Sequence, residues 1–337
     1  MNFSTTRVNS SELNEGNYIS TENMLQDYQG IVDAKSVPED VNVISFYCGD
    51  ILISNIRPYL KKVWKATYNG GCSSDVFVLK ANDNIESDYL HYVIANDKFI
   101  NFVMSGAKGV KMPRGDKNQM KTYSLSLPQI QEQKKIGKML SLLDERIATQ
   151  NKIIDKLQSL IKGIAHKVSK QGKPNIRLSE CLLCTSSTLQ ESDVAEVGAY
   201  PVYGANGIVG YLDTYNTTSE AIYIIKDGSG VGAVSCVKGK CSATGTLNIL
   251  QTKEGFSLRY LYFILKVFSF EPYKTGMAIP HIYFKDYGKA KIYCPSNQLQ
   301  CKYADLLSKI EQKATAEQKI LDNLCSQKQY LLCQMFI

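Results

Sequence analysis

The sequence has few of the features that mark membrane, secreted or metal-binding proteins. None of its apolar runs approaches the roughly 20 residues that a membrane-spanning helix requires. The polar start MNFSTTRVNSSEL lacks the apolar core of a signal peptide. There are only 3 histidines, and the 9 prolines are scattered along the chain. We therefore expect a globular protein without a membrane partner, located in the cytoplasm.

Cysteine is comparatively common, with 10 copies in 337 residues. Because no export signal precedes them, reduced thiols are a better interpretation than disulfides. Cys181 and Cys184 in ECLLC have metal-ligand spacing, but no second CxxC pair and no nearby histidine completes a set of four ligands. The sequence therefore predicts no metal site.

Motifs for catalysis and cofactor binding are also missing. The stretch NIRPY lacks the spacing of the D/N-P-P-Y/F tetrapeptide of adenine methyltransferases, and KDGSGVGAV is typical of a tight turn. In VKGKCSATG, Cys241 stands where a P-loop has serine or threonine. The histidines, His91, His166 and His281, lie in separate segments. We expect a non-catalytic chain that binds no cofactor itself.

What the sequence does contain is an internal repeat. When Pro128 is placed over Pro295, the following segments match without a gap. The matched pairs include Gln131 and Gln298, Gln133 and Gln300, Leu140 and Leu307, Gly109 and Gly276, and Pro113 and Pro280. The chain therefore reads as a globular part followed by a helix, written twice, with parts at 1–127, 128–171, 172–294 and 295–337.

The segments 128–171 and 295–337 have the apolar spacing of long paired helices, with a proline expected in the first turn. The predicted pairing positions are Ile136, Leu140, Leu143, Ile147, Ile154, Leu157 and Ile161 in the first, and Leu307, Ile310, Leu321 and Leu324 in the second. Gln150 and Glu317 interrupt the two seams midway, so an antiparallel pair would set them opposite each other. Alternatively, each helix packs only on its own globular part.

Both globular parts combine strand-like runs, such as GDILISNI and EAIYIIKDG, with one helical stretch, near SDYLHYVIANDKFINFVMS in the first part and near SLRYLYFILKVFSF in the second. This combination predicts an α+β fold. The net charge of +7 is modest, so any nucleic-acid affinity must come from local patches. The candidate DNA-binding residues are Arg57, Lys61, Lys62, Lys108, Lys111, Arg114 and Lys117 in the first part, and Asn206, Lys226, Ser229, Lys274, His281 and Lys285 in the second. The alternative is a solvated loop face.

Together these stretches resemble the specificity (S) subunits of type I restriction-modification systems. LPQIQEQKKIGKMLSLLDERI resembles the conserved helix of that family, and GDILISNIRPYLKKVW, KGVKMPRGDK and YPVYGANGIVGYLDTYN resemble its recognition domains. The resemblance implies two α+β target recognition domains, each reading half of a bipartite double-stranded DNA site. Two long helices would form an antiparallel coiled coil that sets the gap. It also implies two methyltransferase (M) subunits and restriction (R) subunits as partners, which use S-adenosylmethionine, ATP and Mg.

Two alternatives to a DNA reader follow from the same residues. One is a helical-hairpin scaffold, a degenerate relative that binds partners but not DNA. The other is a self-sufficient nuclease or methyltransferase, which the missing motifs disfavour. The second globular part opens with IRLSECL, which has no counterpart at the start of the first part. We therefore expect the first strand of that part to be missing or supplied differently.

Overall fold

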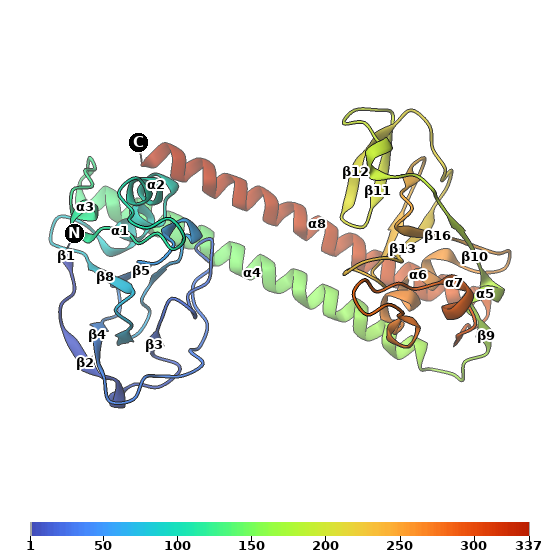
Figure 1. The fold of residues 1–337 in the computed structure, drawn as a ribbon, viewed down its shortest axis with the longest axis horizontal. Coiled ribbons are helices and arrows are strands. Elements are labelled where there is room, and N and C mark those ends of the chain that lie inside the picture. The colour runs from blue at the N-terminus through green and yellow to red at the C-terminus, as the bar shows by residue number, and fades with distance from the viewer. Residues whose placement is uncertain (1, 337) are drawn as a thin grey trace. The chain divides into compact units, whose positions relative to one another are not determined.

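The computed structural model describes residues 2–336, which form two compact units (Figure 1). The first unit joins the residues up to Thr149 with those from Leu321 onward, and the second runs from Gln150 to Ile320. Both units combine sheets with helices, so the predicted α+β class is confirmed. The unit boundary falls inside both long helices, and the four-part division at 127, 171 and 294 stays a prediction.

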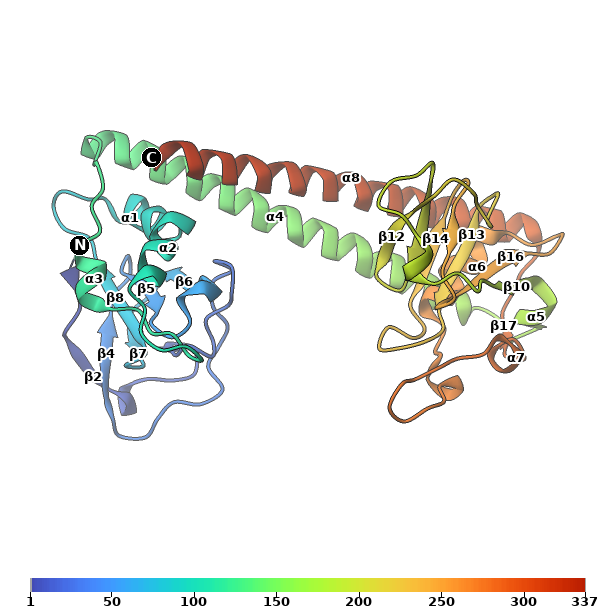
Figure 2. The same cartoon turned by 45° about the horizontal axis from the view of Figure 1, so that its top comes forward.

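The first unit contains two four-stranded sheets, ordered β1-β8-β5-β6 and β2-β4-β7-β3 (Figure 2). Their strands are β1 (Asn2–Phe3), β2 (Arg7–Asn9), β3 (Tyr18–Ile19), β4 (Asn42–Phe46), β5 (Ile51–Ser54), β6 (Val63–Lys65), β7 (Gly70–Cys72) and β8 (Val76–Lys80). The central strand β5 is buried along its whole length, as expected for an apolar run packed on both faces.

Three helices complete this part of the first unit: α1 (Ser87–Ile94), α2 (Asp97–Ser105) and α3 (Lys117–Lys121). The sequence predicts one helix over α1 and α2, and this prediction is wrong because α1 ends at Ile94 and Asn96 begins a second helix. Asn96 is extended, and its side chain accepts a hydrogen bond from the backbone N–H of Lys98, which caps α2. Tyr89 of α1 and Phe99 of α2 lie in the same buried core as β5.

The second unit has sheets ordered β10-β16-β13-β14, β12-β11-β15 and β17-β9. Its strands are β9 (Ile176–Arg177), β10 (Leu182–Ser186), β11 (Tyr200–Gly204), β12 (Gly207–Leu212), β13 (Ala221–Ile225), β14 (Val234–Val237), β15 (Ser242–Ala243), β16 (Leu247–Thr252) and β17 (Lys291–Ile292). Its short helices are α5 (Leu178–Cys181), α6 (Leu258–Val267) and α7 (Phe284–Tyr287). Single 3₁₀ turns in the chain are η1 (Ser10–Glu12), η2 (Pro58–Leu60), η3 (Glu191–Asp193) and η4 (Glu271–Tyr273).

The two units share a strand order. Sheet β1-β8-β5-β6 corresponds to β10-β16-β13-β14, and the parallel pair β3–β7 corresponds to the parallel pair β11–β15. The strand that we expect to be missing from the first globular part is supplied by β1, where Asn2 pairs with Lys80 and Phe3 with Leu79. Two residues therefore take the position that β10 takes beside β16.

The predicted long helices are α4 (Ile130–Ser169) and α8 (Asn297–Met335), of 40 and 39 residues. The prediction that a proline lies in the first turn of each helix is wrong, because Pro128 and Pro295 each lie two residues before the first helical residue. The first helical hydrogen bonds are accepted by the carbonyls of Gln129 and Ser296, so Pro128 and Pro295 lie just before the helices. At that position their carbonyl oxygens are free of the helix and accept from side chains.

The predicted antiparallel pairing of the helices is confirmed. In the second unit the Gln150 amide nitrogen donates to the Glu317 carboxylate and, at 3.1 Å, to the Glu317 carbonyl. In the first unit Lys328 of α8 forms an ion pair with Asp144 of α4 at 2.5 Å. No predicted pairing position is exposed. The helices also pack on their globular parts, because Leu140 and Leu307 lie in the two main cores.

Candidate nucleic-acid interface

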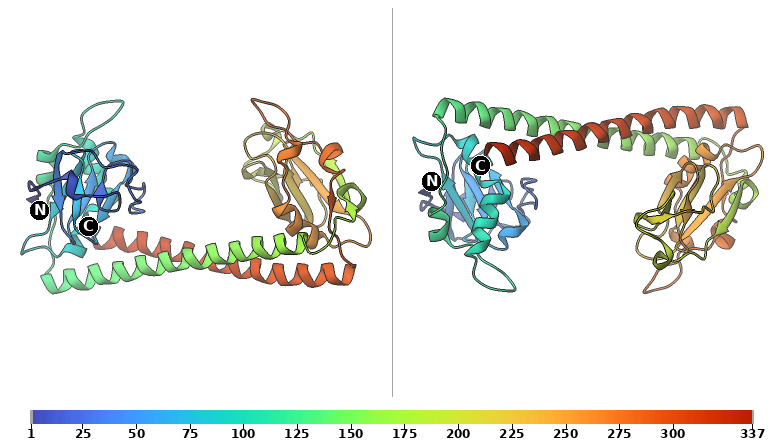
Figure 3. Two further views of the ribbon diagram at one scale, coloured as in Figure 1. Left: turned by 90° about the horizontal axis from the view of Figure 1, so that it is seen from below. Right: turned by 90° about the horizontal axis from the view of Figure 1, so that it is seen from above.

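Each unit carries a protruding loop that is closed in the same way (Figure 3). In the first loop (residues 108–114), the backbone groups of Lys108 and Arg114 exchange two hydrogen bonds of 2.9 Å. In the second loop (residues 275–281), Thr275 and His281 exchange bonds of 2.9 and 2.7 Å. Arg114 and His281 hold matching positions in the sequence repeat, so a basic side chain stands at the end of both loops.

Both loops are anchored to the segment that follows a central strand. The backbone N–H of Arg57, after β5, donates to the carbonyl of Pro113 at 2.8 Å. In the second unit the N–H of Gly228, after β13, donates to the carbonyl of Pro280 at 3.0 Å. The fold thus joins the sequence-separated basic clusters around Arg57 and the first loop. It likewise brings Lys226 beside the second loop, where its carbonyl accepts from the N–H of Ile282 at 2.9 Å.

A glycine at the second position of each loop permits the turn. Gly109 has φ +98° and Gly276 has φ +88°, a region that residues with a Cβ rarely adopt. A Cβ at Gly276 would also lie 2.3 Å from the carbonyl oxygen of Ile279. The shared glycine in the repeat therefore has a conformational cause.

Several of the candidate DNA-binding side chains in the first unit form ion pairs with carboxylates. Arg114 pairs with Asp75 at 2.9 Å, and Lys108 pairs with Asp116 at 3.1 Å. The hydrogen bond from Lys108 and two backbone N–H groups lowers the pKa of the Asp116 carboxyl. Lys111, at the exposed middle of the loop, has no ion-pair partner among residues 2–336.

The remaining candidate lysines of this unit contact residues outside the first loop. Lys61 pairs with Asp97 at 2.8 Å, and Lys117 lies 4.8 Å from the ring centre of Phe3. Lys62 donates to the carbonyl of Thr21 at 2.6 Å. Burial, followed by the nearby charge of Arg57, lowers the pKa of the Lys62 ammonium. These three side chains are half-buried, so they are more restrained than Lys111.

In the second unit, His281 at the end of the loop lies 2.7 Å from the Asp227 carboxylate through Nδ1. Lys274, just before the loop, pairs with Glu271 at 2.5 Å, and Lys285 lies over the ring of Tyr283. Ser229 is exposed next to the anchoring segment. Asn206 lies apart, exposed in the turn between β11 and β12, without a hydrogen bond to the second loop in the described chain.

Sequence reasoning missed two buried glutamines that join the helices to the globular parts. Gln133 of α4 accepts from the N–H of Glu86, which caps α1, at 2.9 Å and donates to the Pro128 carbonyl at 2.9 Å. Gln300 of α8 accepts from the N–H of Ser257, which caps α6, at 2.9 Å and donates to the Pro295 carbonyl at 2.8 Å. The only sign of this role in the sequence was that Gln133 and Gln300 occupy matching positions of the repeat.

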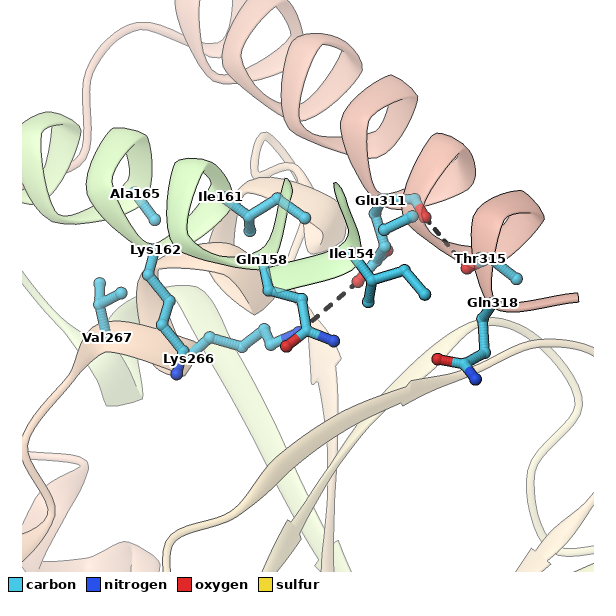
Figure 4. Close-up of a pocket in the computed structure, with 11 residues that line it drawn as sticks. Ile154, Gln158, Ile161, Lys162, Ala165, Lys266, Val267, Glu311, Thr315 and Gln318 are labelled. Carbon is cyan, nitrogen blue, oxygen red and sulfur yellow. Dashed lines mark hydrogen bonds and ion pairs between the residues drawn. The ribbon is translucent and has the colours of Figure 1, made fainter. Parts of the chain in front are cut away.

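The long helices also carry grooves and exposed apolar side chains. In the second unit a groove of about 430 Å³ lies between α4, α8 and α6, with Ile154, Ile161 and Ala165 on its apolar side and Lys266 and Glu311 at its polar side (Figure 4). Four exposed apolar residues of the long helices form two matching pairs in the repeat. These are Met139 and Leu306, and Ile153 and Ile320.

Metal sites, membrane-spanning helices and reactive cysteines are other features that residues 2–336 could contain. No cluster of three or more potential metal ligands occurs there, and none of the helices in that range has the length and apolarity needed to cross a bilayer. All 10 cysteines are free thiols. Cys181 is buried, which raises the pKa of its thiol to about 12, so this side chain is a poor nucleophile.

A protein-family comparison matches the chain twice, at residues 4–159 and 181–325, to the type I restriction modification DNA specificity domain. One similar protein is the putative type I restriction enzyme MjaX specificity subunit of Methanocaldococcus jannaschii, 33% identical over 143 residues, which cover 40% of this chain. Another is the type I restriction enzyme EcoDI specificity subunit of Escherichia coli, 24% identical over 123 residues, which cover 36% of the chain. The matched segments span 33% and 27% of those relatives.

Solved structures are similar along the whole chain. The S subunit of a type I restriction-modification system from M. genitalium has a TM-score of 0.67 at 20% identity, covering 100% of this chain and 96% of that one. A chain from a study of complex assembly and conformational transition of the type I system has a TM-score of 0.55 at 17% identity, covering 99% and 94%. At these identities the likeness shows a shared fold.

Proposed function

Because the chain belongs to the family of type I restriction modification DNA specificity domains, we propose that it is the DNA-reading subunit of a type I restriction-modification complex. Each globular part reads one half of a bipartite double-stranded target. The observation that carries this proposal is the duplicated loop. Residues 108–114 and 275–281 have the same closure, the same glycine conformation and a basic side chain at the same end.

The side chains of the first loop divide into two roles. Lys111 is exposed and unpaired in the described chain, which suits a contact to phosphate, where charge matters more than orientation. Arg114 is oriented by its ion pair with Asp75, and an oriented guanidinium suits a two-pronged contact to a guanine edge. His281, oriented by Asp227, is the corresponding candidate in the second half-site.

The long helices are proposed to set the gap between the half-sites. A 40-residue α-helix is about 60 Å long at 1.5 Å per residue, more than one DNA turn of about 34 to 36 Å. The first globular part precedes α4 and the second follows it, so the helix separates the readers along the chain. Unspecified base pairs would then lie between the half-sites.

Two methyltransferase subunits are proposed to dock on the helices. Apolar side chains recur at matching exposed positions on α4 and α8, as Met139 and Leu306 and as Ile153 and Ile320. Exposed apolar side chains that recur at matching positions of two helices are what two copies of one partner would contact. The partners, including restriction subunits, would supply the chemistry with S-adenosylmethionine, ATP and Mg, and this chain would supply no catalytic residue.

The alternative is a scaffold that binds partners but not DNA. The observation in its favour is that carboxylates already neutralise several candidate cations, including Arg114, Lys108 and Lys274. On a DNA-binding surface these carboxylates would have to exchange their partners for phosphate or base groups. The duplicated loop outweighs this observation, because a scaffold gives no reason for a loop with the same closure and glycine conformation in both units.

The deciding experiment is a map of N6-methyladenine in a methylation-free bacterium that co-produces this chain and the methyltransferase encoded beside it. A bipartite motif with a fixed gap is the expected result, and it would supply both half-sites. Co-purification of the two proteins without any methylated motif would instead support the scaffold.

A charge-reversal variant separates the two functions residue by residue. Changing Lys111, Arg114 and Lys117 to glutamate should abolish specific DNA binding and leave methyltransferase binding intact. The matched control is Lys35→Glu, at an exposed lysine of the same unit outside the loop. If the triple variant still methylates the same motif, the first loop does not read DNA.

A further inference from the structure

The two loops share a second feature, which is apolar and points outward. In the first loop the relative exposures of Val110 and Met112 are 104% and 47%. At the matching positions of the second loop, those of Met277 and Ile279 are 107% and 59%. Each loop thus presents two apolar side chains, separated by one residue, at its tip. We call each pair an apolar tip.

Recurrence distinguishes the apolar tips from ordinary exposed apolar residues, which are common singly on protein surfaces. The loops KGVKMPR and TGMAIPH share only a glycine and a proline in identity. The residue between the tip positions changes from Lys111 to Ala278, and the tip residues themselves differ. At both tip positions the residue type differs between the loops, but the side chain is apolar and exposed in each. This indicates a contact that requires apolar surface.

We propose that each apolar tip enters a DNA groove and contacts bases through its apolar surface, one tip in each half-site. This inference rests on the proposed function and adds a reading element to it. The favoured targets are the methyl group of thymine, a direct apolar feature of the major groove, and base faces exposed where a step is partly unstacked.

The surroundings of the tips favour DNA over a protein partner. Lys111 between the first pair of apolar residues is exposed and has no ion-pair partner in the described chain, which suits a phosphate contact. Lys108, Arg114, Lys274 and His281 lie in or beside the loops and would exchange their carboxylate partners for DNA. The loops are also narrow, because cross-loop hydrogen bonds close them six residues apart. Two side chains cover far less than the roughly 1,000 Å² of a specific protein interface, whereas a groove admits a narrow loop.

Salt dependence provides the test, because apolar contacts release no counterions. The variant is Val110→Ser with Met112→Ser in the full chain, assembled with its methyltransferase and bound to a duplex that carries the mapped target. We expect affinity to fall by about tenfold or more, with an unchanged slope of log K against log salt. Lys111→Ala, by contrast, should reduce that slope by about one.

The matched control is Val41→Ser, which removes an exposed valine beside Glu39 and Asp40, where DNA is not expected. Its affinity should equal that of the parent, and all variants should unfold at the parent's temperature because the replaced side chains are in solvent. Changing Met277 and Ile279 to serine should weaken discrimination in the other half-site of the methylation map.

Unchanged affinity of the Val110 and Met112 variant, together with an unchanged half-site for the Met277 and Ile279 variant, would overturn the inference while leaving the proposed function standing. A loss accompanied by a smaller salt slope would also overturn it, since the loop would then reach only phosphates. If the parent complex methylates no bipartite motif at all, the proposed function fails, and the inference fails with it.

Discussion

At the scale of single residues, Gln133 should be a strong determinant of stability in the first unit. Its side chain is 1% exposed and bonds to the Glu86 N–H and to the carbonyls of Asn84 and Pro128. Gln133→Met keeps the volume but removes all three hydrogen bonds, which are part-buried, and each is worth about 0.5–1.5 kcal/mol. We expect a lower free energy of unfolding in urea, whereas Gln131→Met, at an exposed glutamine of the same helix, should be neutral.

A second residue-scale prediction concerns His91 and acid. Burial lowers the pKa of this histidine from 6.5 to about 4, with Asp144 and Asp88 opposing and Lys328 and Lys65 assisting. Between these two pH values His91 is protonated in the unfolded chain and neutral in the folded chain. The stability from neutral His91 is therefore complete above pH 6.5 and is lost as the pH falls toward 4.

His91→Phe should flatten this part of the curve of unfolding free energy against pH, by an amount on the order of 1–3 kcal/mol. His166→Phe, at an exposed histidine of α4, serves as the control and should keep the parent curve. Superimposable curves for His91→Phe and the parent would contradict the assignment.

The sequence predicted some residue roles better than others. The pairing of Gln150 with Glu317 could be predicted because heptad spacing along two helices fixes which positions face each other. The roles of Gln133 and Gln300 could not, because their partners, Glu86 and Ser257, lie in another part of the chain. Only the fold brings them together.

At the scale of elements, the pairing of α4 with α8 includes a polar contact that should cost stability. Gln150 is 8% exposed and Glu317 is 7% exposed, and hydrogen bonds from Lys313 and Gln150 lower the pKa of the Glu317 carboxyl. Replacing both with leucine should raise the unfolding temperature, since a well-packed apolar pair avoids the cost of removing polar groups from water. An unchanged unfolding temperature would mean that the pair is effectively solvated.

Elements with a strong local pattern were predictable, and those that depend on tertiary contacts were not. The apolar repeats located α4 and α8 to within a few residues at each end, and apolar runs located β5 and β13. The break at Asn96 was missed because an apolar pattern continues across it, while a side-chain cap decides the boundary. The backbone hydrogen bond from Arg57 to Pro113 that anchors the first loop could not be predicted either, because it joins segments far apart in the sequence.

At the scale of the whole molecule, the two helices should act as a spacer. The unit boundaries at Thr149 and Ile320 offer insertion points in α4 and α8 that leave every contact within each unit intact. One heptad added to both helices lengthens them by about 10 Å, roughly three base pairs, but turns DNA by about 100°. A heptad rotates the helix itself by only about 20°, so the readers fall out of phase with the groove.

Three heptads added at the same points lengthen the helices by about 32 Å, close to one full DNA turn. We therefore expect the single-heptad variant to methylate poorly, and the three-heptad variant to methylate the same half-sites across a gap about nine base pairs longer. The methylation map measures both quantities at once. An unchanged gap in the longer variant would show that spacing is set by the partners and not by these helices, because no other element changed length.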